Sequence, residues 1–327
     1  MMNSRTARQL AALLLIGGAV LVATVPAALA QPYPSKLVKM LIGYPAGSGT
    51  DLYGRAIAKH LQNSLGWRVI IENKIGAAGN IAVESAVRAP ADGYTILLSA
   101  SQIVINPFVR KLSYDIEKDL IPVLQTTAVS YVLVTSPKFP ANDLAELIDV
   151  IKKNPGKFNY GSYGSGSGPH LSMVMLQGLA GIQAAHVQYS GSPQMLTALM
   201  AGEIEMAFDT PQSLMSHIQS GRLKAIAIAG PNPLEVIPGV APIAKMFPGF
   251  DTDGWQGIFV PAGTPKGVVD KLAEEVAKAL HSPEIESMSA RLGVRLVGST
   301  PEVFAAYMKN ELRKYEQIVR ENNIRVD

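Results

Sequence analysis

The chain has 327 residues, with 29 Lys and Arg against 26 Asp and Glu, and it contains no cysteine. The lack of cysteine excludes disulfides, thiolate nucleophiles and cysteine-ligated metals. The near balance of charge, without a basic run interleaved with aromatics, argues against nucleic acid as a partner.

The N-terminus is typical of a secretion signal. Arg5 and Arg8 precede an apolar run at 10–25, and Ala28-Leu29-Ala30 fits the small-x-small pattern that signal peptidase recognises. A membrane anchor is the alternative, but the run is short for a span, and no later stretch is long and apolar enough to cross a bilayer. We therefore predict that residues 1–30 are a cleaved signal peptide and that the protein is periplasmic.

Cleavage would leave 297 residues carrying 27 basic and 26 acidic groups, because the removed segment holds two arginines and no acid. This length is sufficient for two lobes, each with its own core. Strands and helices then alternate in two series. The first has strands at 37–43, 67–72 and 94–100 and helices at 51–65 and 79–88. The second has strands at 131–135, 158–161, 185–188, 206–208 and 223–228 and helices at 142–154, 169–179 and 195–201.

The β-α-β order predicts an α/β protein with two parallel sheets covered by helices. A Pro- and Gly-rich connection at 231–250 follows, and after it come a strand at 257–260 and helices at 265–280, 283–291 and 301–322. We expect the chain to cross between lobes near 130–135 and again near 250–256. The predicted lobes are 32–131 plus 256–327, and 132–255.

Two loops rich in glycine and serine are the strongest functional signal. Each of them, Gly43–Asp51 and Gly161–His170, follows a predicted strand and precedes a predicted helix. Such a loop can direct backbone N–H groups and the positive end of a helix at an anion, while glycine permits close approach and hydroxyls add donors. Glycine for purely steric reasons is the alternative for a single loop. Two loops, one in each lobe and neither with Lys or Arg, favour a carboxylate site.

Other polar side chains near these loops are weaker candidates. His170 could contact a ligand, or it could be an ordinary surface or supporting histidine. Asp209 follows a strand and could bind ligand or water, or it could cap the next helix. Tyr44, Tyr163 and Tyr189 could line a pocket, because tyrosine combines an apolar face with a polar tip.

Catalytic motifs are missing from the sequence. No G-x-S-x-G nucleophile elbow, P-loop or G-x-G-x-x-G occurs, and the five histidines have no metal-ligand spacing. We expect a protein that is not an enzyme and that needs no cofactor or metal.

Nine short segments in a fixed order connect the sequence with a known family. They are Tyr33-Pro34-Ser35-Lys36, Pro45–Asp51, Val69–Lys74, Gly76–Asn80, Ala91–Thr95, Asn159–Ser162, His186–Gly191, Phe208-Asp209 and Pro261–Pro265. At these positions the chain resembles the substrate-binding proteins of tripartite tricarboxylate transporters, the Bug or TctC-like receptors. The resemblance extends over nearly all of the chain after residue 30.

This resemblance implies a type II periplasmic-binding-protein fold, in which two α/β lobes close on a ligand in the cleft between them, like a Venus flytrap. Family members bind carboxylates such as citrate, amino acids and aromatic acids, and the family's contacts carry over to Ala46, Gly47, Ser48, Ser165, Gly166 and Ser167. Tyr44, Tyr163, His170 and Asp209 are lesser candidates. The first loop reads Ala-Gly-Ser-Gly where Pro-Gly-Gly-Gly is usual, and Gln188 and Ser190 replace the common Pro and Lys. The ligand therefore cannot be inferred from relatives.

The expected function is solute capture and delivery by a monomer to membrane transporter subunits. Two alternatives remain open at this point. One is a receptor of the same fold that reports to a sensor protein, and the other is a secreted α/β enzyme.

Overall fold

The structure is a computed structural model that describes residues 33–321. The predicted signal peptide, residues 1–30, lies outside the described residues. The chain divides into two compact units, Met1–Ser35 and Lys36–Asp327, and every helix and strand below belongs to the second unit. Among the described helices, none combines the length and apolarity that crossing a membrane requires.

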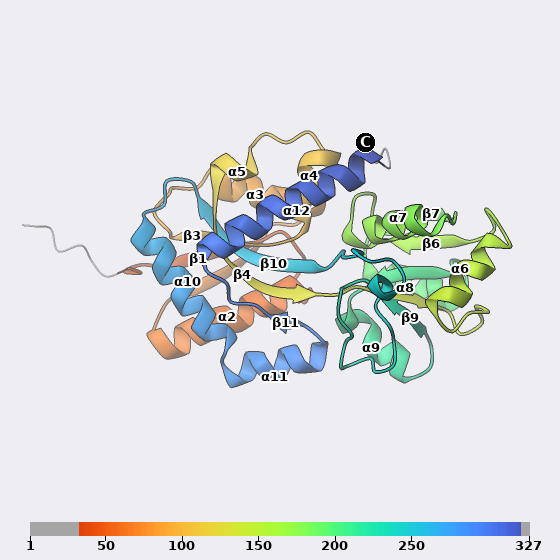
Figure 1. Ribbon diagram of the computed structural model, residues 1–327. Coiled ribbons are helices and arrows are strands. Elements are labelled where there is room, and N and C mark those ends of the chain that lie inside the picture. Colours follow the sequence, from red (N-terminus) through yellow and green to blue (C-terminus); the bar gives the residue numbers. More distant parts are fainter. Residues whose placement is uncertain (1–32, 322–327) are drawn as a thin grey trace, which may run out of the picture. The chain divides into compact units, whose positions relative to one another are not determined.

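Two mixed sheets organise the second unit (Figure 1). The first sheet has the strand order β11-β4-β10-β3-β1-β2. Its strands are β1 (Val38–Ile42), β2 (Val69–Asn73), β3 (Thr95–Ala100), β4 (Leu120–Val129), β10 (Gly254–Pro261) and β11 (Arg295–Leu296). The second sheet has the order β7-β6-β8-β5-β9. Its strands are β5 (Val132–Thr135), β6 (Asn159–Ser162), β7 (Ala185–Gln188), β8 (Met206–Asp209) and β9 (Lys224–Ile228).

The prediction of purely parallel sheets is wrong. Strands β1, β2 and β3 are parallel, but β10 runs antiparallel to both β3 and β4. In the second sheet β6 is parallel to β7 and β8, whereas β5 is antiparallel to β8 and β9. The reason is connectivity. Strand β4 leaves the first sheet toward the second, and β10 re-enters from that side, so the two must run in opposite directions.

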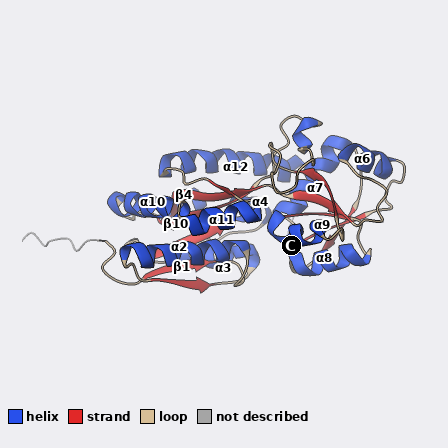
Figure 2. Ribbon diagram, turned by 90° about the horizontal axis from the view of Figure 1, so that it is seen from below, coloured by secondary structure: helices blue, strands red, loops and turns tan. Residues whose placement is uncertain are grey.

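Helices flank both groups of strands (Figure 2). Those that accompany the first sheet are α2 (Gly49–Leu65), α3 (Asn80–Val87), α4 (Gln102–Val109), α5 (Ile116–Asp119), α10 (Lys266–Leu280), α11 (Pro283–Leu292), α12 (Pro301–Glu321) and the 3-10 turn η1 (Ala77–Gly79). Those of the second sheet are α6 (Leu144–Lys152), α7 (Gly168–Ala180), α8 (Ser192–Ala201), α9 (Pro211–Gln219) and η2 (Ile243–Lys245). Strands β4 and β11 and helices α4, α5 and α9 were not predicted from the sequence.

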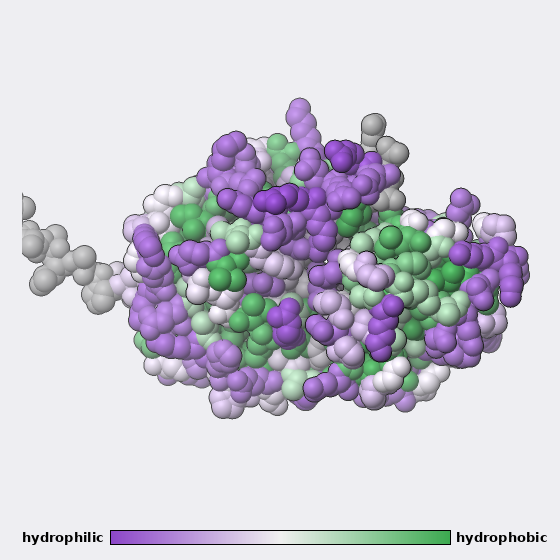
Figure 3. Space-filling view, viewed as in Figure 1, coloured by the Kyte–Doolittle hydropathy of each residue, from purple (hydrophilic) through white to green (hydrophobic). Residues whose placement is uncertain are grey.

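Helix α12 illustrates how the first core forms. Phe304, Met308, Leu312 and Tyr315 are buried at helical spacing and belong to one hydrophobic cluster with Trp255 of β10. The outward face of this helix is hydrophilic (Figure 3). Amphipathic spacing thus predicts both the helix and the face that packs on the sheet.

The two sheets are joined by two crossings. The chain passes from β4 to β5 through Ser130 and Tyr131, and it returns from β9 to β10 through residues 229–253. At the first crossing the Tyr131 hydroxyl lies against the start of α7, where a Cβ on Gly168 would be only 2.4 Å from it. Gly168 is therefore required for this close approach, and the crossing is packed directly against one of the two glycine-serine loops.

Candidate functional site

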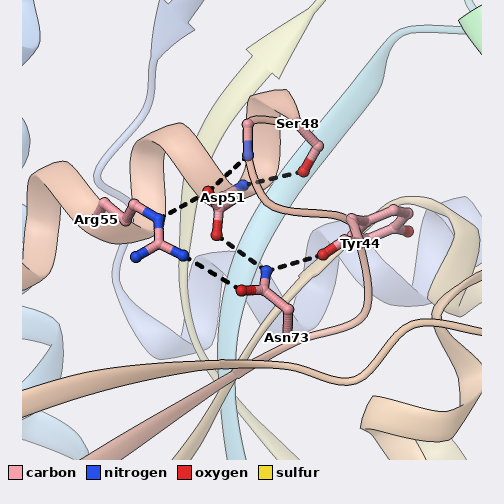
Figure 4. A network of polar contacts seen from close by, with 6 residues as sticks. Tyr44, Ser48, Asp51, Arg55 and Asn73 are labelled. Carbon is pink, nitrogen blue, oxygen red and sulfur yellow. Dashed lines mark hydrogen bonds and ion pairs between the residues drawn. The ribbon is translucent and has the colours of Figure 1, made fainter.

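The first loop, between β1 and α2, is held by a buried carboxylate (Figure 4). Asp51 is 1% exposed, and its Oδ2 accepts hydrogen bonds from the Gly47 amide at 2.9 Å and from Arg55 Nε at 2.8 Å. Asn73 Nδ2 donates to Asp51 Oδ1 and to the Tyr44 carbonyl oxygen, both at 2.9 Å. Burial alone would raise the pKa of Asp51, but the hydrogen bonds from Arg55, Gly47 and Asn73 outweigh it and lower the pKa. The carboxylate therefore stays charged and fixes the loop.

This network determines which groups of the first loop remain free. The Gly47 amide is engaged by Asp51, and the Ser48 amide donates to the Pro45 carbonyl at 3.1 Å. Ser48 Oγ accepts from the Asp51 amide at 3.3 Å, as an N-cap does. Gly49 and Thr50 are the first two residues of α2, so their amides have no acceptor within the helix. The donors at this helix start are therefore two residues further along than the predicted Gly47.

The second loop, between β6 and α7, has a similar arrangement. His170 Nδ1 accepts from the Gly166 amide at 3.1 Å, and the Ser167 amide donates to the Gly164 carbonyl at 3.0 Å. Ser167 is the N-cap residue of α7, yet its hydroxyl makes no capping bond. That hydroxyl is buried, in a residue only 8% exposed, and has no hydrogen-bond partner among the described residues. A polar atom left unpaired at a helix N-terminus is a ready contact for an anion.

The His170 ring packs beside two other aromatic rings. Its ring lies 4.3 Å from the ring of His186 and 6.2 Å from that of Tyr160, centroid to centroid. Burial, and then the neighbouring His186, lowers the pKa of His170 to about 4. The imidazole is therefore neutral at pH 7, and its unprotonated Nδ1 can accept the Gly166 N–H. The histidine thus acts as a positioning group in this structure.

Asp209 is likewise engaged within the protein. It is 1% exposed, and Oδ1 accepts from the Thr210 amide at 2.7 Å and from the Tyr163 hydroxyl at 3.3 Å. Its Oδ2 accepts from the Ser192 hydroxyl. Burial raises the pKa of Asp209 to about 6, although these hydrogen bonds counteract part of the effect. The carboxyl group therefore orients Tyr163 and joins the starts of α8 and α9.

Three tyrosines gather near the crossing. Burial, followed by the nearby Tyr131, raises the pKa of Tyr44. Burial also raises the pKa of Tyr163, with contributions from Asp209, Tyr131 and Tyr44. Burial likewise raises the pKa of Tyr131. All three phenols are therefore neutral hydroxyls that can act as donors. Tyr189, by contrast, packs against the hydrophobic cluster of the second sheet.

Each loop lies close to a glutamine side chain from the other lobe. Gln102 of α4 donates from Nε2 to the Gly166 carbonyl oxygen at 3.0 Å. A Cβ placed on Gly49 would lie 3.8 Å from Nε2 of Gln212, at the start of α9, and 3.8 Å from Nε2 of Gln256, in β10. The starts of α2 and α7 therefore lie beside residues of the opposite lobe.

Two predicted site residues form no side-chain hydrogen bond in the described structure, and several residues around the loops were not predicted. Ala46 is exposed and Ser165 is half-buried, and neither has a side-chain partner among residues 33–321. The Asp51–Arg55 pair could have been found from its i,i+4 spacing. Nothing local marks Gln102, Gln212 or Gln256, which the fold alone brings to the loops.

Features of other site types were not found nearby. No group of three or more His, Asp or Glu residues within residues 33–321 is placed to hold a metal ion. A surface groove of about 620 Å³ between α5 and α12, lined by Tyr114 and Arg313 among others, contains none of the predicted site residues.

Comparisons with known proteins agree on one family. The model of the tripartite tricarboxylate transporter family receptor matches residues 53–324. The chain is 27% identical to the periplasmic binding protein BugD, with a TM-score of 0.80, over 90% of this chain and 100% of that one. It is 28% identical to MatC from Rhodopseudomonas palustris, solved with bound malate, at a TM-score of 0.77 and coverage of 88% and 100%. It is 26% identical to an R. palustris protein solved with adipate, at a TM-score of 0.82 and coverage of 90% and 100%.

Proposed function

Because the chain belongs to the tripartite tricarboxylate transporter receptor family, whose fold is that of two-lobed periplasmic binding proteins, we propose that it captures a small carboxylate between its lobes and delivers it to a membrane transporter. The observation that carries this proposal is the pair of helix N-termini, those of α2 and α7, on two loops that contain no Lys or Arg. Neutral donors and helix dipoles suit a carboxylate.

The proposed lobes are residues 32–131 plus 256–327, and 132–255. The mature protein would be a periplasmic monomer after removal of residues 1–30. Membership of a receptor family supports binding without turnover, so the ligand should leave the protein chemically unchanged.

The proposed ligand contacts fall into two groups. Direct donors to the carboxylate would be the amides at the start of α2, the hydroxyls of Ser165 and Ser167, and the amides of Ser165 and Gly168. Ser48, Gly47, Gly166, His170 and Asp209 would hold these donors in place, because their polar groups already bond within the protein. The malate and adipate bound by related proteins support a dicarboxylate as the first class to test.

Closure would follow from contact with both lobes at once. A ligand shifts the equilibrium between open and closed states only by its difference in affinity for the two. A carboxylate bonded to the starts of both α2 and α7 has that difference, because only the closed state offers both. The Gln102–Gly166 hydrogen bond would stabilise the closed state with or without ligand.

The proposal is tested by native mass spectrometry of gently purified protein and by a thermal-shift screen of mono- and dicarboxylates, each beside its neutral amide. We expect acids to raise the melting temperature and amides to do so much less. Equal stabilisation by acids and amides, or chemical conversion of the recovered ligand, would refute it.

A further inference from the structure

Two glutamine side chains lie near the start of α2, and each has a buried oxygen without a hydrogen-bond partner among the described residues. Gln256, from β10, is 8% exposed, and Gln212, the second residue of α9, is half-buried. The Nε2 atom of each lies 3.8 Å from the position that a Cβ on Gly49 would occupy. The Oε1 atom of each is buried and has no hydrogen-bond partner among the described residues.

The neighbouring side chains do not supply the missing donors. Gly49 has no side chain, and the Asp51 carboxylate can only accept hydrogen bonds, as it does from Gly47, Arg55 and Asn73. A buried amide carbonyl without a donor destabilises the folded state. Two such groups, on glutamines that both reach Gly49 from different lobes, indicate that a molecule outside the chain completes them.

We propose that Gln212 and Gln256 select ligands that carry an O–H or N–H group beside the carboxylate, in preference to the unsubstituted acid. This inference rests on the proposed function and deepens it. The Nε2 groups, with the Gly49 amide, donate to the carboxylate. A hydroxyl or ammonium on the neighbouring carbon then donates to the Oε1 atoms.

The positions of the two glutamines connect selection with closure. Gln256 lies opposite Ala100 at the end of the first sheet that faces the second lobe, whereas Gln212 belongs to the second lobe. A ligand held by both glutamines gains bonds that are available together only when the lobes are together. A substituted acid therefore favours the closed state more strongly than its plain counterpart.

The test compares succinate, malate and aspartate, which share a dicarboxylate skeleton, by calorimetry on the full protein. We expect malate or aspartate to bind at least about tenfold tighter than succinate, since an unpaired buried polar group discriminates strongly against a ligand that lacks the partner. Lactate with propionate, and 2-hydroxyglutarate with glutarate, are the further matched pairs.

Variants identify the responsible residues. Gln256→Met and Gln212→Met keep the length of the side chain and remove its polar end. The plain acid should then bind about tenfold more weakly because it loses an Nε2 donor, and the substituted acid should lose more, so that the ratio of plain to substituted dissociation constants falls to about one. Gln219→Met, at an exposed position of the same helix α9, is the matched control and should keep the wild-type ratio. The melting temperature of unliganded Gln256→Met should be equal to or above that of wild type, because an unpaired buried amide is removed.

The outcomes separate the two levels of the argument. Equal binding of plain and substituted acids by wild type, as expected if water fills the space, would overturn this inference and leave the proposed function standing. A lower melting temperature in Gln256→Met with equal loss of both ligands would show a merely structural glutamine and also overturn it. Failure of every matched pair to bind would refute the proposed function itself.

Discussion

Replacing Asp51 with Asn tests whether the buried carboxylate holds the first loop. Asn has nearly the same shape but only one acceptor oxygen and no charge. It can still accept from Asn73, but its NH2 group then faces the Gly47 amide and Arg55 Nε, which now donate to the carboxylate at 2.9 and 2.8 Å. Gly47 is exposed and the Arg55 side chain is 51% exposed, so water can recover part of both bonds.

The expected cost is about 2–3 kcal/mol, corresponding to one charge-assisted hydrogen bond after this recovery. With an unfolding entropy near 2.1 cal/mol/K per residue, that lowers the melting temperature of a chain this long by about 4 °C. Thermal melts followed by circular dichroism measure it. Asp270→Asn is the control, because Asp270 also pairs at i,i+4, with Lys266, but is 50% exposed. It should change stability by less than about 0.5 kcal/mol.

The pH dependence gives a second measure of the same bond. The pKa of Asp51 is lower in the folded protein than in the unfolded chain, where it is ~4. The ionised carboxylate therefore stabilises the fold fully above pH ~4, and this stabilisation is lost as the pH falls through the pKa of the folded state. The gap between wild type and Asp51→Asn should therefore narrow in acid. At about 2 °C per kcal/mol, an Asp51→Asn variant that melts within 1 °C of wild type at pH 7 would refute the reasoning. An equal drop in melting temperature in Asp270→Asn would refute it as well.

Three further predictions follow from the second lobe. Ser165→Pro removes a backbone donor and should weaken carboxylate binding by about tenfold or more in calorimetry, while Ser165→Ala shows whether the hydroxyl also contributes; retained affinity in the folded Pro variant would exclude this loop from the site. Burial raises the pKa of Asp209 to about 6, so protonation of this carboxyl stabilises the folded state fully below pH ~4, and this contribution is lost as the pH rises through 6. The melting temperature of wild type should therefore fall relative to that of Asp209→Asn between these pH values. Parallel curves of melting temperature against pH for the two proteins would contradict this. Gly168→Ala places a Cβ 2.4 Å from the Tyr131 hydroxyl and should cost about 1–3 kcal/mol in chemical denaturation; Tyr131→Phe should relieve part of that loss, and an unaffected Gly168→Ala would disprove the close contact.

Local pattern predicted the elements whose residues follow a simple period. The strand at 94–100 and the helix at 301–322 correspond to β3 and α12, since one is continuously apolar and the other amphipathic. Strand β4 was missed because Gln125, Thr126 and Thr127 interrupt its apolar run, although the fold buries all three. Antiparallel pairing was missed because it depends on where the chain re-enters a sheet, which no local window records.

The candidate site divides in the same way. Its loops could be found because glycine and serine between a strand and a helix are a local signal. Which amides remain free could not be predicted locally. Asn73, 22 residues from Asp51 in the sequence, donates to one oxygen of that carboxylate, and the Gly47 amide donates to the other. Gln212 and Gln256 lie much further along the chain, and only the meeting of two lobes brings them to Gly49.

The charge arrangement is compatible with release of the proposed ligand. Arg55, a cation close to the first loop, is already paired with Asp51, so a carboxylate bound as proposed would meet helix ends, hydroxyls and amides. These neutral donors lose little when the cleft opens to water, whereas a buried, unpaired cation would be costly in the closed empty state. In the proposed site the first lobe contributes the start of α2 and the second lobe the start of α7, and the donors of one lobe alone would bind a small anion weakly. Affinity would therefore depend on closure, and a partner that opens the lobes would lower it without having to compete for the ligand.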